Sequence, residues 1–405
     1  MTYDVVVVGA GIVGLATARE LLRRRSGQRL AVIDKEPRIG AHQTGHNSGV
    51  VHSGIYYAPG SLKARLCVAG ARELYAYCRE RGIPVERCGK VIVATEEAEL
   101  GRLQALYERG LANGVPGLEL IGPERLREIE PHCAGIRAIW SPATGIVDFS
   151  EVARHYALDV RAAGGEVHTG RELLGLRDDR DAVVLETSAG ELRAARVVTC
   201  AGLHADRVAA LSGGPRTPRI IPFRGDYWQL RADARSLCRN LIYPVPDPAF
   251  PFLGVHATRR IGTGEVWLGP NAVLAFAREG YRRRDLRPRD LLETLGEPGF
   301  RRLARRYWRA GLQELWRDWS KRAFWRSVRR YLPEVGLEDM MPGPAGVRAQ
   351  AVDPSGALLD DFVVDGDHRI LHVRNAPSPA ATSSLALARL IVDTVERRLG
   401  CGAPG

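Results

Sequence analysis

The chain has 405 residues, of which 45% are hydrophobic and 26% are charged, so it can bury one large core or two smaller ones and is not a disordered chain. No run of 18 or more apolar residues is present, which argues against a segment that spans a bilayer. Seven cysteines without a CxxC pair, and a strand in place of an N-terminal signal peptide, predict a reducing, cytoplasmic compartment.

The formal net charge of +11 is unevenly placed. Residues 278–330 contain sixteen Arg and one Lys against seven Asp and Glu, which gives this segment +10 of the total. The remainder of the chain is therefore close to neutral.

The N-terminal segment predicts a βαβ unit. An apolar strand from Tyr3 to Val8 leads into the motif GAGIVG, a helix follows to about Arg25, and a second strand runs from Leu30 to Ile33. In this motif the first glycine permits a tight turn, the second lets the backbone approach a pyrophosphate, and the third lets helix and strand pack closely. The helix N-terminus then presents unpaired N–H groups to the phosphates. The residues expected at the dinucleotide are Gly9, Gly11, Ile12, Val13 and Gly14.

Asp34 ends the second strand, twenty residues after Gly14. A carboxylate at this position accepts hydrogen bonds from the ribose hydroxyls of an adenosine and repels a 2′-phosphate. We assign the neighbouring Lys35 to the same site. The motif alone does not separate NAD from FAD.

Two later segments favour a flavin. An apolar strand at 196–200 ends in Ala201 and Gly202, and a strand from about 369 leads through NAPSPAATSS into a C-terminal helix. A dinucleotide motif whose domain closes with the last residues of the chain looks like the FAD-binding domain of the D-amino-acid oxidase-like flavoproteins. In the C-terminal segment, prolines fix the entry to the helix, and its N-terminal amides can stabilise negative charge on a reduced flavin. The residues assigned to the cofactor there are Ala376, Pro377, Ser378 and Thr382.

Four separated stretches closely resemble the L-2-hydroxyglutarate dehydrogenases (oxidases). They read HQTGHNSGVVHSGIYYAPGSLKA, PFRGDYW, PFLGVHATRRIGTGEVWLGPNAVLAFAREGY, and GPAGVRAQAVDPSGALLDDFVV followed by RILHVRNAPSPAATSSLAL. The resemblance implies that FAD oxidises L-2-hydroxyglutarate to 2-oxoglutarate and that the electrons pass to a membrane quinone or to oxygen. One alternative is an FAD-dependent oxidase of another 2-hydroxy acid or of an amino acid, similar to glycine or sarcosine oxidase. A second is an RNA-directed flavoprotein, but no RNA-binding module is recognisable and no nucleic-acid partner is expected.

The loop after Asp34 reads GAHQTGHNSGVVHSGIYYAPG over residues 40–60. In this fold class it runs along the flavin, where glycines such as Gly49 allow close backbone approach. No acidic or cysteine ligands accompany its histidines, so no metal site is predicted. The side chains assigned to the phosphate, the ribitol and the ring edges are Thr44, Asn47 and Ser48, and those assigned to the ring are His46 and His52.

Oxidation of a 2-hydroxy acid requires a base for the hydroxyl proton and a cation for the carboxylate. Histidine suits the base, so His256 in a strand-like segment is the first candidate and His52 the second. The alternative is that His256 is a half-buried sheet residue, and that the loop histidines hydrogen-bond loop carbonyls. The candidates for substrate binding are Arg224, Tyr227, Arg259, Arg374 and Asn375, where a partly buried Arg224 has either the substrate or a structural acid as its partner.

The basic segment 282–330 is helical in composition, with tryptophans at three- to four-residue spacing. Such a helix lies on the anionic inner face of the cell membrane, near quinone, or packs its aromatic face onto the protein. The fold class predicted is mixed α/β, with a Rossmann-like FAD-binding domain interleaved with a mixed-sheet substrate domain. The expected boundaries are 1–85, 145–220 and 340–405 for the FAD-binding domain, and 86–144 and 221–339 for the substrate-binding domain.

Overall fold

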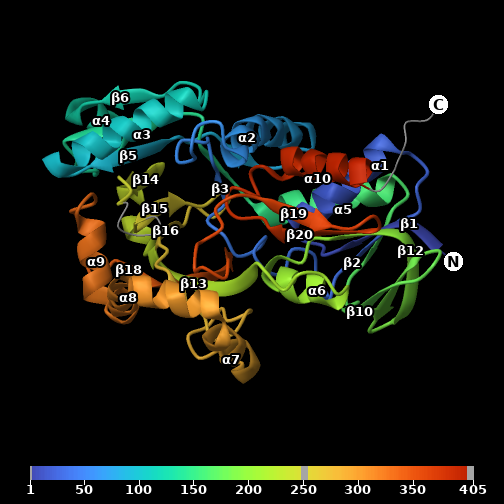
Figure 1. The fold of residues 1–405 in the computed structure, drawn as a ribbon. Coiled ribbons are helices and arrows are strands. Elements are labelled where there is room, and N and C mark those ends of the chain that lie inside the picture. Colours follow the sequence, from blue (N-terminus) through green and yellow to red (C-terminus); the bar gives the residue numbers. More distant parts are fainter. Residues whose placement is uncertain (1, 248–253, 399–405) are drawn as a thin grey trace.

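The computed structural model describes residues 2–247 and 254–398. In this part of the chain, two large β-sheets lie side by side and a small sheet joins them (Figure 1). The first and last described elements, β1 and α10, lie toward the end of the molecule formed by the first sheet, and α8 and α9 lie toward the opposite end (Figure 1). The mixed α/β class predicted from the sequence is confirmed.

The first sheet has a parallel centre made of β20, β12, β1, β2 and β9. An antiparallel hairpin, β10 and β11, extends it beyond β12, and β19 pairs with β20. The strands are β1 (Thr2–Val8), β2 (Leu30–Ile33), β9 (Glu166–His168), β10 (Leu173–Asp178), β11 (Val183–Thr187), β12 (Gly190–Thr199), β19 (Val363–Gly366) and β20 (Ile370–Asn375).

Both faces of the first sheet are covered, which explains the continuous apolar run at its centre. Val5 and Val7 of β1 pack against four helices on one face, whereas Val6 and Val8 pack against residues of β10 and β11 on the other. The four helices are α1 (Ile12–Arg24), α2 (Leu62–Glu80), α5 (Phe149–Ala162) and α10 (Ser384–Arg398), and α6 (Ala205–Leu211) lies on the opposite side (Figure 1).

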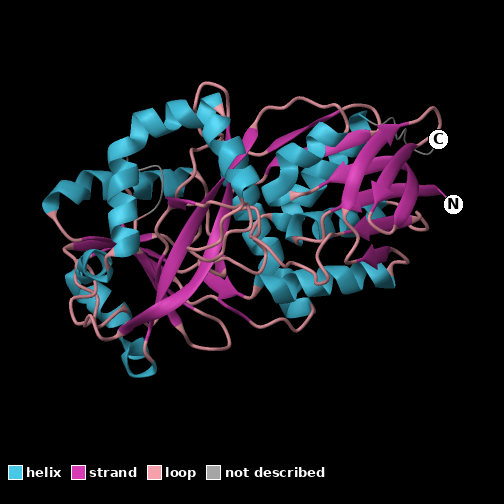
Figure 2. Ribbon diagram, turned by 90° about the horizontal axis from the view of Figure 1, so that it is seen from below, coloured by secondary structure: helices cyan, strands magenta, loops and turns pink. Residues whose placement is uncertain are grey.

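The second sheet is mixed and strongly curved (Figure 2). Its order is β17-β13-β16-β15-β14-β5-β7-β6, and β18 pairs with β13. The strands are β5 (Lys90–Ala94), β6 (Glu119–Ile121), β7 (Arg137–Ser141), β13 (Arg219–Leu230), β14 (Leu241–Pro244), β15 (His256–Arg259), β16 (Val266–Gly269), β17 (Val273–Leu274) and β18 (Met340–Val352). The small sheet contains β3 (Val50–Val51), β4 (Val85–Glu86) and β8 (Gly145–Val147).

The two faces of the second sheet have different neighbours. Val91 and Val93 belong to a core with Phe324 of α9, whereas Ile92 and Tyr243 belong to a core with α3 and with the loop after β3. We call the second of these the loop-side face, because it packs against loop 52–57. The helices around this sheet are α3 (Leu100–Ala112), α4 (Pro123–Ile129), α7 (Pro288–Gly296), α8 (Pro298–Trp319) and α9 (Lys321–Arg329). The helical prediction for the basic segment is confirmed by α7, α8 and α9.

Two details differ from the sequence expectation. β18, at residues 340–352, is a strand of the second sheet, although this range was expected in the FAD-binding domain. Its long antiparallel pairing with β13 decides its position, and no local signal encodes that pairing. The C-terminal helix begins at Ser384, so residues 376–383 form turns and not the first turn of a helix.

Candidate active site

A cavity of about 760 Å³ lies at the carboxyl ends of β1, β2, β12 and β20. This is the edge at which open α/β sheets bind their ligands. Most of the cofactor residues predicted from the sequence line it. They are Gly9, Gly11, Ile12, Val13, Asp34, Lys35, Thr44, Asn47, Ser48, His52, Ala201, Gly202, Ala376, Ser378 and Thr382.

A glycine is needed at each of the three positions of the GAGIVG motif for a different structural reason. Gly9 has a φ of +111°, a region that L side chains rarely adopt, and a Cβ there would lie 2.4 Å from the Cys200 carbonyl oxygen. A Cβ on Gly14 would lie 1.9 Å from the Gly9 carbonyl oxygen. A Cβ on Gly11 would meet nothing closer than Thr44 Oγ1 at 3.4 Å, so its absence leaves open space on the cavity wall. Gly9 and Gly14 therefore shape the turn, and Gly11 shapes the binding surface.

Polar side chains fix the strand ends around the motif. Asp34 accepts hydrogen bonds from the backbone N–H groups of Ala10, at 2.6 Å, and of Glu36, at 2.8 Å. Thr44 Oγ1 accepts the N–H of Ile12 at 3.0 Å, which satisfies one donor at the start of α1. The contact of Asp34 with a ribose stays a prediction.

Glu36, His42 and Glu279 come close enough together to suggest a cation site. The ammonium of Lys35 already forms ion pairs there with both carboxylates, 2.6 Å from Glu279. Burial would raise the pKa of Glu279, but hydrogen bonds from His204 and Lys35 outweigh it and lower the pKa. The two carboxylates therefore already share a cation supplied by the protein.

Four predicted cofactor residues lie behind the cavity wall: Gly14, His46, Gly49 and Pro377. The ring of His46 stacks on Tyr281 with 4.0 Å between ring centres, and its Nδ1 lies 3.1 Å from the Ala345 carbonyl oxygen. His46 therefore hydrogen-bonds a carbonyl of strand β18, not a loop carbonyl as the alternative expected, and does not line the cavity.

The C-terminal turn holds the loop that carries His52. Thr382 Oγ1 accepts the backbone N–H of His52 at 3.1 Å, and Asn375 Nδ2 donates to the carbonyl oxygens of Leu359 and Asp361. Arg374 is fully buried and donates to the Pro215 and Thr217 carbonyl oxygens. Asn375 and Arg374 line the cavity as well, but the Asn375 amide nitrogen and the two terminal nitrogens of Arg374 donate within the protein.

The cavity fits a dinucleotide cofactor. Its volume is in the range of small-molecule sites, and Gly11 precedes α1 without a side-chain cap. Two buried nitrogens of residues in its wall, His52 Nδ1 and Arg374 Nε, have no hydrogen-bond partner in the described part of the chain. Such groups are normally satisfied by a partner, so a polar ligand is expected beside them.

A second group of candidate residues lies on the loop-side face of the second sheet. His256 of β15 stacks on Tyr243 of β14 with 4.0 Å between ring centres, and the ammonium of Lys90 on β5 lies 4.8 Å from the same tyrosine ring. Lys90 also lies 4.4 Å from the ring of Tyr56, in the loop that carries His52. The loop after β3 thus lies beside this face, and His256 is among the groups that lower the pKa of His52.

Both histidines are neutral at physiological pH. Burial, followed by the charge of Lys90, lowers the pKa of His52 to about 3. Burial also lowers the pKa of His256 to about 4, against a hydrogen bond to the Gly254 carbonyl oxygen. This bond, 2.9 Å long, fixes the tautomer of His256, because a carbonyl only accepts. Nδ1 therefore carries the proton, and Nε2 keeps a free lone pair.

Cations surround these histidines. The charges of Lys90 and Arg348 both act on His52 and His256, and those of Arg348 and Arg260 both act on the buried Tyr227. Arg348 has a large accessible area, yet burial lowers its pKa. Both observations hold if its side chain projects into a space enclosed by protein. The predicted residue Tyr227 is thus beside the site.

Two predicted arginines have acidic partners elsewhere. Arg224 Nε lies 3.0 Å from Asp226, and its Nη2 lies 3.6 Å from Asp318. Arg259 pairs with Glu86. For Arg224, this is the structural acid that the sequence left open as one of two partners.

Sequence reasoning missed Lys90, Arg348, Arg260, Tyr56 and Tyr243. The sequence does contain a local signal for Lys90, because it is the first residue of the strand KVIVA and the four residues after it are all apolar. A lysine in such an apolar strand indicates a partner or a ligand, since lysine is rarely fully buried without one. No comparable local signal distinguishes Arg348 or Arg260 from the many surface arginines.

The fold and the glycine-lined cavity define a flavoprotein oxidoreductase of the two-lobed class. The sequence pattern of the DAO family, described as FAD dependent oxidoreductase, matches residues 4–394. Two solved structures share the fold. FAD-bound L-alpha-glycerophosphate oxidase from Mycoplasma pneumoniae has a TM-score of 0.79 and 20% identity, with coverage of 98% of this chain and 95% of that one. Glycine oxidase from Geobacillus kaustophilus has a TM-score of 0.73 and 20% identity, also with coverage of 98% of this chain and 95% of that one. The cofactor is FAD.

Relatives of known name are closer in sequence. The chain is 50% identical to the human "L-2-hydroxyglutarate dehydrogenase, mitochondrial" over 98% of this chain and 89% of that one. It is 45% identical to the L-2-hydroxyglutarate dehydrogenase of Indibacter alkaliphilus, over 98% and 100%, and 46% identical to that of Escherichia coli, over 98% and 94%. The chain belongs to the L-2-hydroxyglutarate dehydrogenase family of FAD-dependent oxidoreductases, which confirms the resemblance seen in the sequence.

Proposed function

We propose that this protein oxidises L-2-hydroxyglutarate to 2-oxoglutarate. The relatives that share 45–50% of its sequence carry this activity in their names. The observation that carries the proposal in the structure is the position of His256, which stacks on Tyr243 beside the ammonium of Lys90 and donates from Nδ1 to the Gly254 carbonyl oxygen. A neutral imidazole and fixed positive charge are what a hydroxy-dicarboxylate substrate requires.

FAD, when bound, supplies the hydride acceptor for an alcohol carbon. His256 accepts the hydroxyl proton at Nε2, whose lone pair is kept free by the hydrogen bond of Nδ1 to Gly254. His52 is the second candidate, since its Nδ1 is buried without a partner in the described residues. Arg348 is our candidate for the carboxylate next to the reacting carbon, because a planar guanidinium matches a carboxylate with two parallel hydrogen bonds.

This assignment puts the substrate against strands β5, β14 and β15. These strands fall in the predicted substrate-binding ranges 86–144 and 221–339, and β18 adds Arg348 from outside them. We retain the predicted division into FAD-binding and substrate-binding domains on this basis, with residues 340–352 moved to the substrate side.

The direct test is anaerobic bleaching of the bound flavin by a substrate panel. It contains L- and D-2-hydroxyglutarate, L-lactate, glycolate, glycine, sarcosine and L-glycerol 3-phosphate. We expect rapid bleaching by L-2-hydroxyglutarate alone. Faster bleaching by a monocarboxylic hydroxy acid or by an amino acid would replace the proposal with the corresponding oxidase.

The role of His256 is tested by His256→Gln in a rapid-mixing assay. We expect FAD to stay bound and flavin reduction to slow by about a hundredfold or more, the usual effect of losing a general base. His52→Gln is the matched comparison. Near-normal reduction in His256→Gln together with a large loss in His52→Gln would assign the base to His52.

We further propose that the electrons pass to a membrane quinone and that α8 is the surface that contacts the membrane. Its apolar side chains recur along one side of the helix and are exposed, with Trp319 at 77% and Trp316 at 65%. Arginines flank them, as in helices that lie on anionic lipid. The exposed apolar residues of α8 are Trp308, Leu312, Leu315, Trp316 and Trp319, and we call them the α8 stripe. Trp325 of α9, by contrast, packs against the core.

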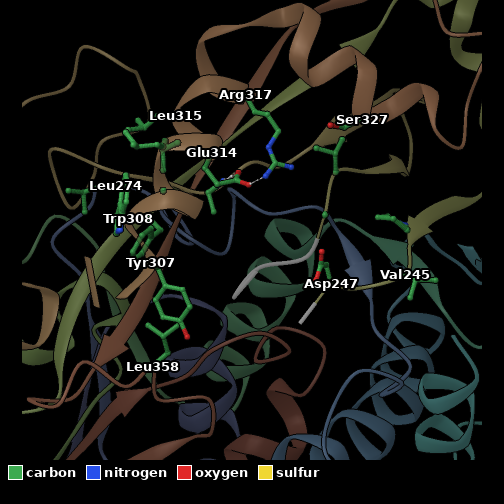
Figure 3. Close-up of a pocket in the computed structure, with 18 of the residues that line it drawn as sticks. Val245, Asp247, Leu274, Tyr307, Trp308, Glu314, Leu315, Arg317, Ser327 and Leu358 are labelled. Carbon is green, nitrogen blue, oxygen red and sulfur yellow. Dashed lines mark hydrogen bonds and ion pairs between the residues drawn. The ribbon is translucent and has the colours of Figure 1, made fainter. Parts of the chain in front are cut away.

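A second cavity, of about 630 Å³, adjoins the α8 stripe. Figure 3 shows Tyr307, Trp308 and Leu315 on one side of it and Val245 and Asp247 on the other. Its largely apolar wall suits the ring and first isoprene units of a quinone. In the part of the chain that is described, no helix is long and apolar enough to cross a membrane, so contact through α8 would be peripheral.

Co-sedimentation with phosphatidylglycerol vesicles tests the membrane contact. We expect binding at low salt that weakens at high salt, and a loss of about tenfold or more in the double variant Trp316→Ser, Trp319→Ser. Leu111→Ser is the control, since Leu111 is 50% exposed on α3. Absence of binding at low salt would remove the proposal, and comparison of ubiquinone analogues with oxygen in steady-state turnover would assign the acceptor.

A further inference from the structure

Lys90 is a buried cation without an acidic partner. Its side chain is 1% exposed, and within residues 2–247 and 254–398 the Cys67 thiol is the one group that raises its pKa. Burial raises the pKa of that thiol to about 12, so the thiol carries no compensating charge at neutral pH. Lys63, also buried, differs because Asp360 lies 2.7 Å from its Nζ. An uncompensated ammonium in a protein interior is strongly unfavourable. The position therefore calls for an anion that comes from outside the chain.

The ammonium of Lys90 lies between two aromatic rings. The rings of Tyr56 and Tyr243 lie 4.4 Å and 4.8 Å from Nζ, which compensates part of its charge through cation–π contact. The hydroxyl of Tyr56 is buried and has no hydrogen-bond partner in the described residues. An ammonium and a free phenol can both donate to one carboxylate. Burial lowers the pKa of Lys90 to about 7, which an anionic ligand would reverse.

Strand order sets His256 between two cations. Along the sheet the order is β18-β13-β16-β15-β14-β5, so Lys90 on β5 and Arg348 on β18 lie on opposite sides of His256 on β15. Tyr243 on β14 stands between His256 and Lys90. A ligand whose reacting carbon lies at His256 therefore has Lys90 on one side along the sheet and Arg348 on the other.

We propose that Lys90 binds the carboxylate farthest from the reacting carbon and so makes the site selective for dicarboxylic 2-hydroxy acids. This inference rests on the proposed function. Arg348, with its planar fork, suits the carboxylate beside the reacting carbon, where orientation matters most. Lys90 suits the other end, because the rings of Tyr56 and Tyr243 beside it can cover methylene groups and its ammonium needs only a point contact.

The test compares two substrates that differ only at the far end. L-2-Hydroxyglutarate carries a carboxylate there, and L-2-hydroxypentanoate carries a methyl group on the same five-carbon chain. In Lys90→Met, we expect kcat/KM for flavin reduction by the diacid to fall about a hundredfold or more, mainly through KM, while kcat/KM for the monoacid changes by less than about threefold. Arg348→Met is the matched variant and should lower kcat/KM for flavin reduction by the same factor with both substrates.

The proposal would be overturned if Lys90→Met lowered kcat/KM equally for both substrates, or if kcat/KM for the diacid were unchanged. Replacing a buried unpaired charge by an apolar side chain of similar length should leave folding intact, which FAD content and thermal unfolding will check. If the variant does not fold, calorimetry on the wild-type holoenzyme decides. Binding of 2-oxoglutarate should then exceed that of 2-oxopentanoate and lose this advantage above about pH 7, and equal binding of the two would refute the role of Lys90. Wild-type protein inactive on L-2-hydroxyglutarate would instead refute the proposed function itself.

Discussion

Gly14→Ala should destabilise the protein through one backbone contact. The added Cβ would lie 1.9 Å from the Gly9 carbonyl oxygen and 3.3 Å from Cys200 Cβ, whereas Cβ atoms in proteins almost never approach other atoms within 3.0 Å. Helix α1 must therefore move away from β1 by about 1 Å or more. Overpacking of this kind usually costs about 1–3 kcal/mol, and we expect the upper end because backbone, not a flexible side chain, opposes the methyl group.

Gly11→Ala is the matched control, since its Cβ would lie no closer than 3.4 Å to any neighbour. It should unfold in urea at the wild-type midpoint, yet bind FAD about tenfold more weakly or worse, because the methyl group enters the cavity that Gly11 lines. Circular dichroism of the apoprotein gives the unfolding midpoint, and flavin absorbance after gel filtration gives the FAD content. A Gly14→Ala variant as stable as wild type, or equal destabilisation by Gly11→Ala, would refute the reasoning.

Three further predictions follow from buried groups. For the diacid, kcat/KM for flavin reduction should fall as the pH drops through about 4, because the base must be unprotonated and the pKa of His256 is lowered to about 4. The same kcat/KM should fall again above about pH 7, where Lys90 loses its proton. A stopped-flow pH profile that shows no fall near pH 4 would exclude His256 as the base. Arg278→Met should lower the unfolding free energy by about 3 kcal/mol, because it removes the buried partner of Asp206 and leaves, among the described residues, only Arg219, 3.6 Å away, to compensate that carboxylate. Arg289→Met, at an exposed pair with Glu293, should change the unfolding free energy by less than about 0.5 kcal/mol in urea titrations. Thr382→Val should slow flavin reduction and cost about 1–3 kcal/mol, because it removes the acceptor of the His52 N–H; unchanged kinetics and stability would show that this bond does not position the loop.

The cofactor half of the site could be predicted because its signals are local. Gly9, Gly11 and Gly14 lie within one turn between a strand and a helix, and Asp34 follows at the spacing that a βαβ unit imposes. The predicted strand at 30–33 and the helix to about residue 25 agree with β2 and α1 within a residue. Local geometry of this kind is encoded by neighbouring residues.

The substrate half could not be predicted to the same degree. Arg224 and Arg374 were reasonable choices from apolar flanks and chain position, but their partners come from distant segments, Asp318 for the first and the turn at 215–217 for the second. Conversely, Lys90 becomes notable only when β5 is found beside β14. Whether a charged side chain is paired depends on contacts between segments far apart in the chain.

The sequence by itself determined the FAD-binding unit, the family and a short set of candidate histidines, because these depend on glycines, spacing and residue type within short segments. Only the tertiary structure decided which charged and titratable side chains lie together on the substrate side. The pairing of β13 with β18, and of β5 with β14, gathers Lys90, His256 and Arg348 from three separate parts of the chain onto one sheet. The physical reason is that the burial and the partners of a charge are set by three-dimensional packing, which no short stretch of sequence contains.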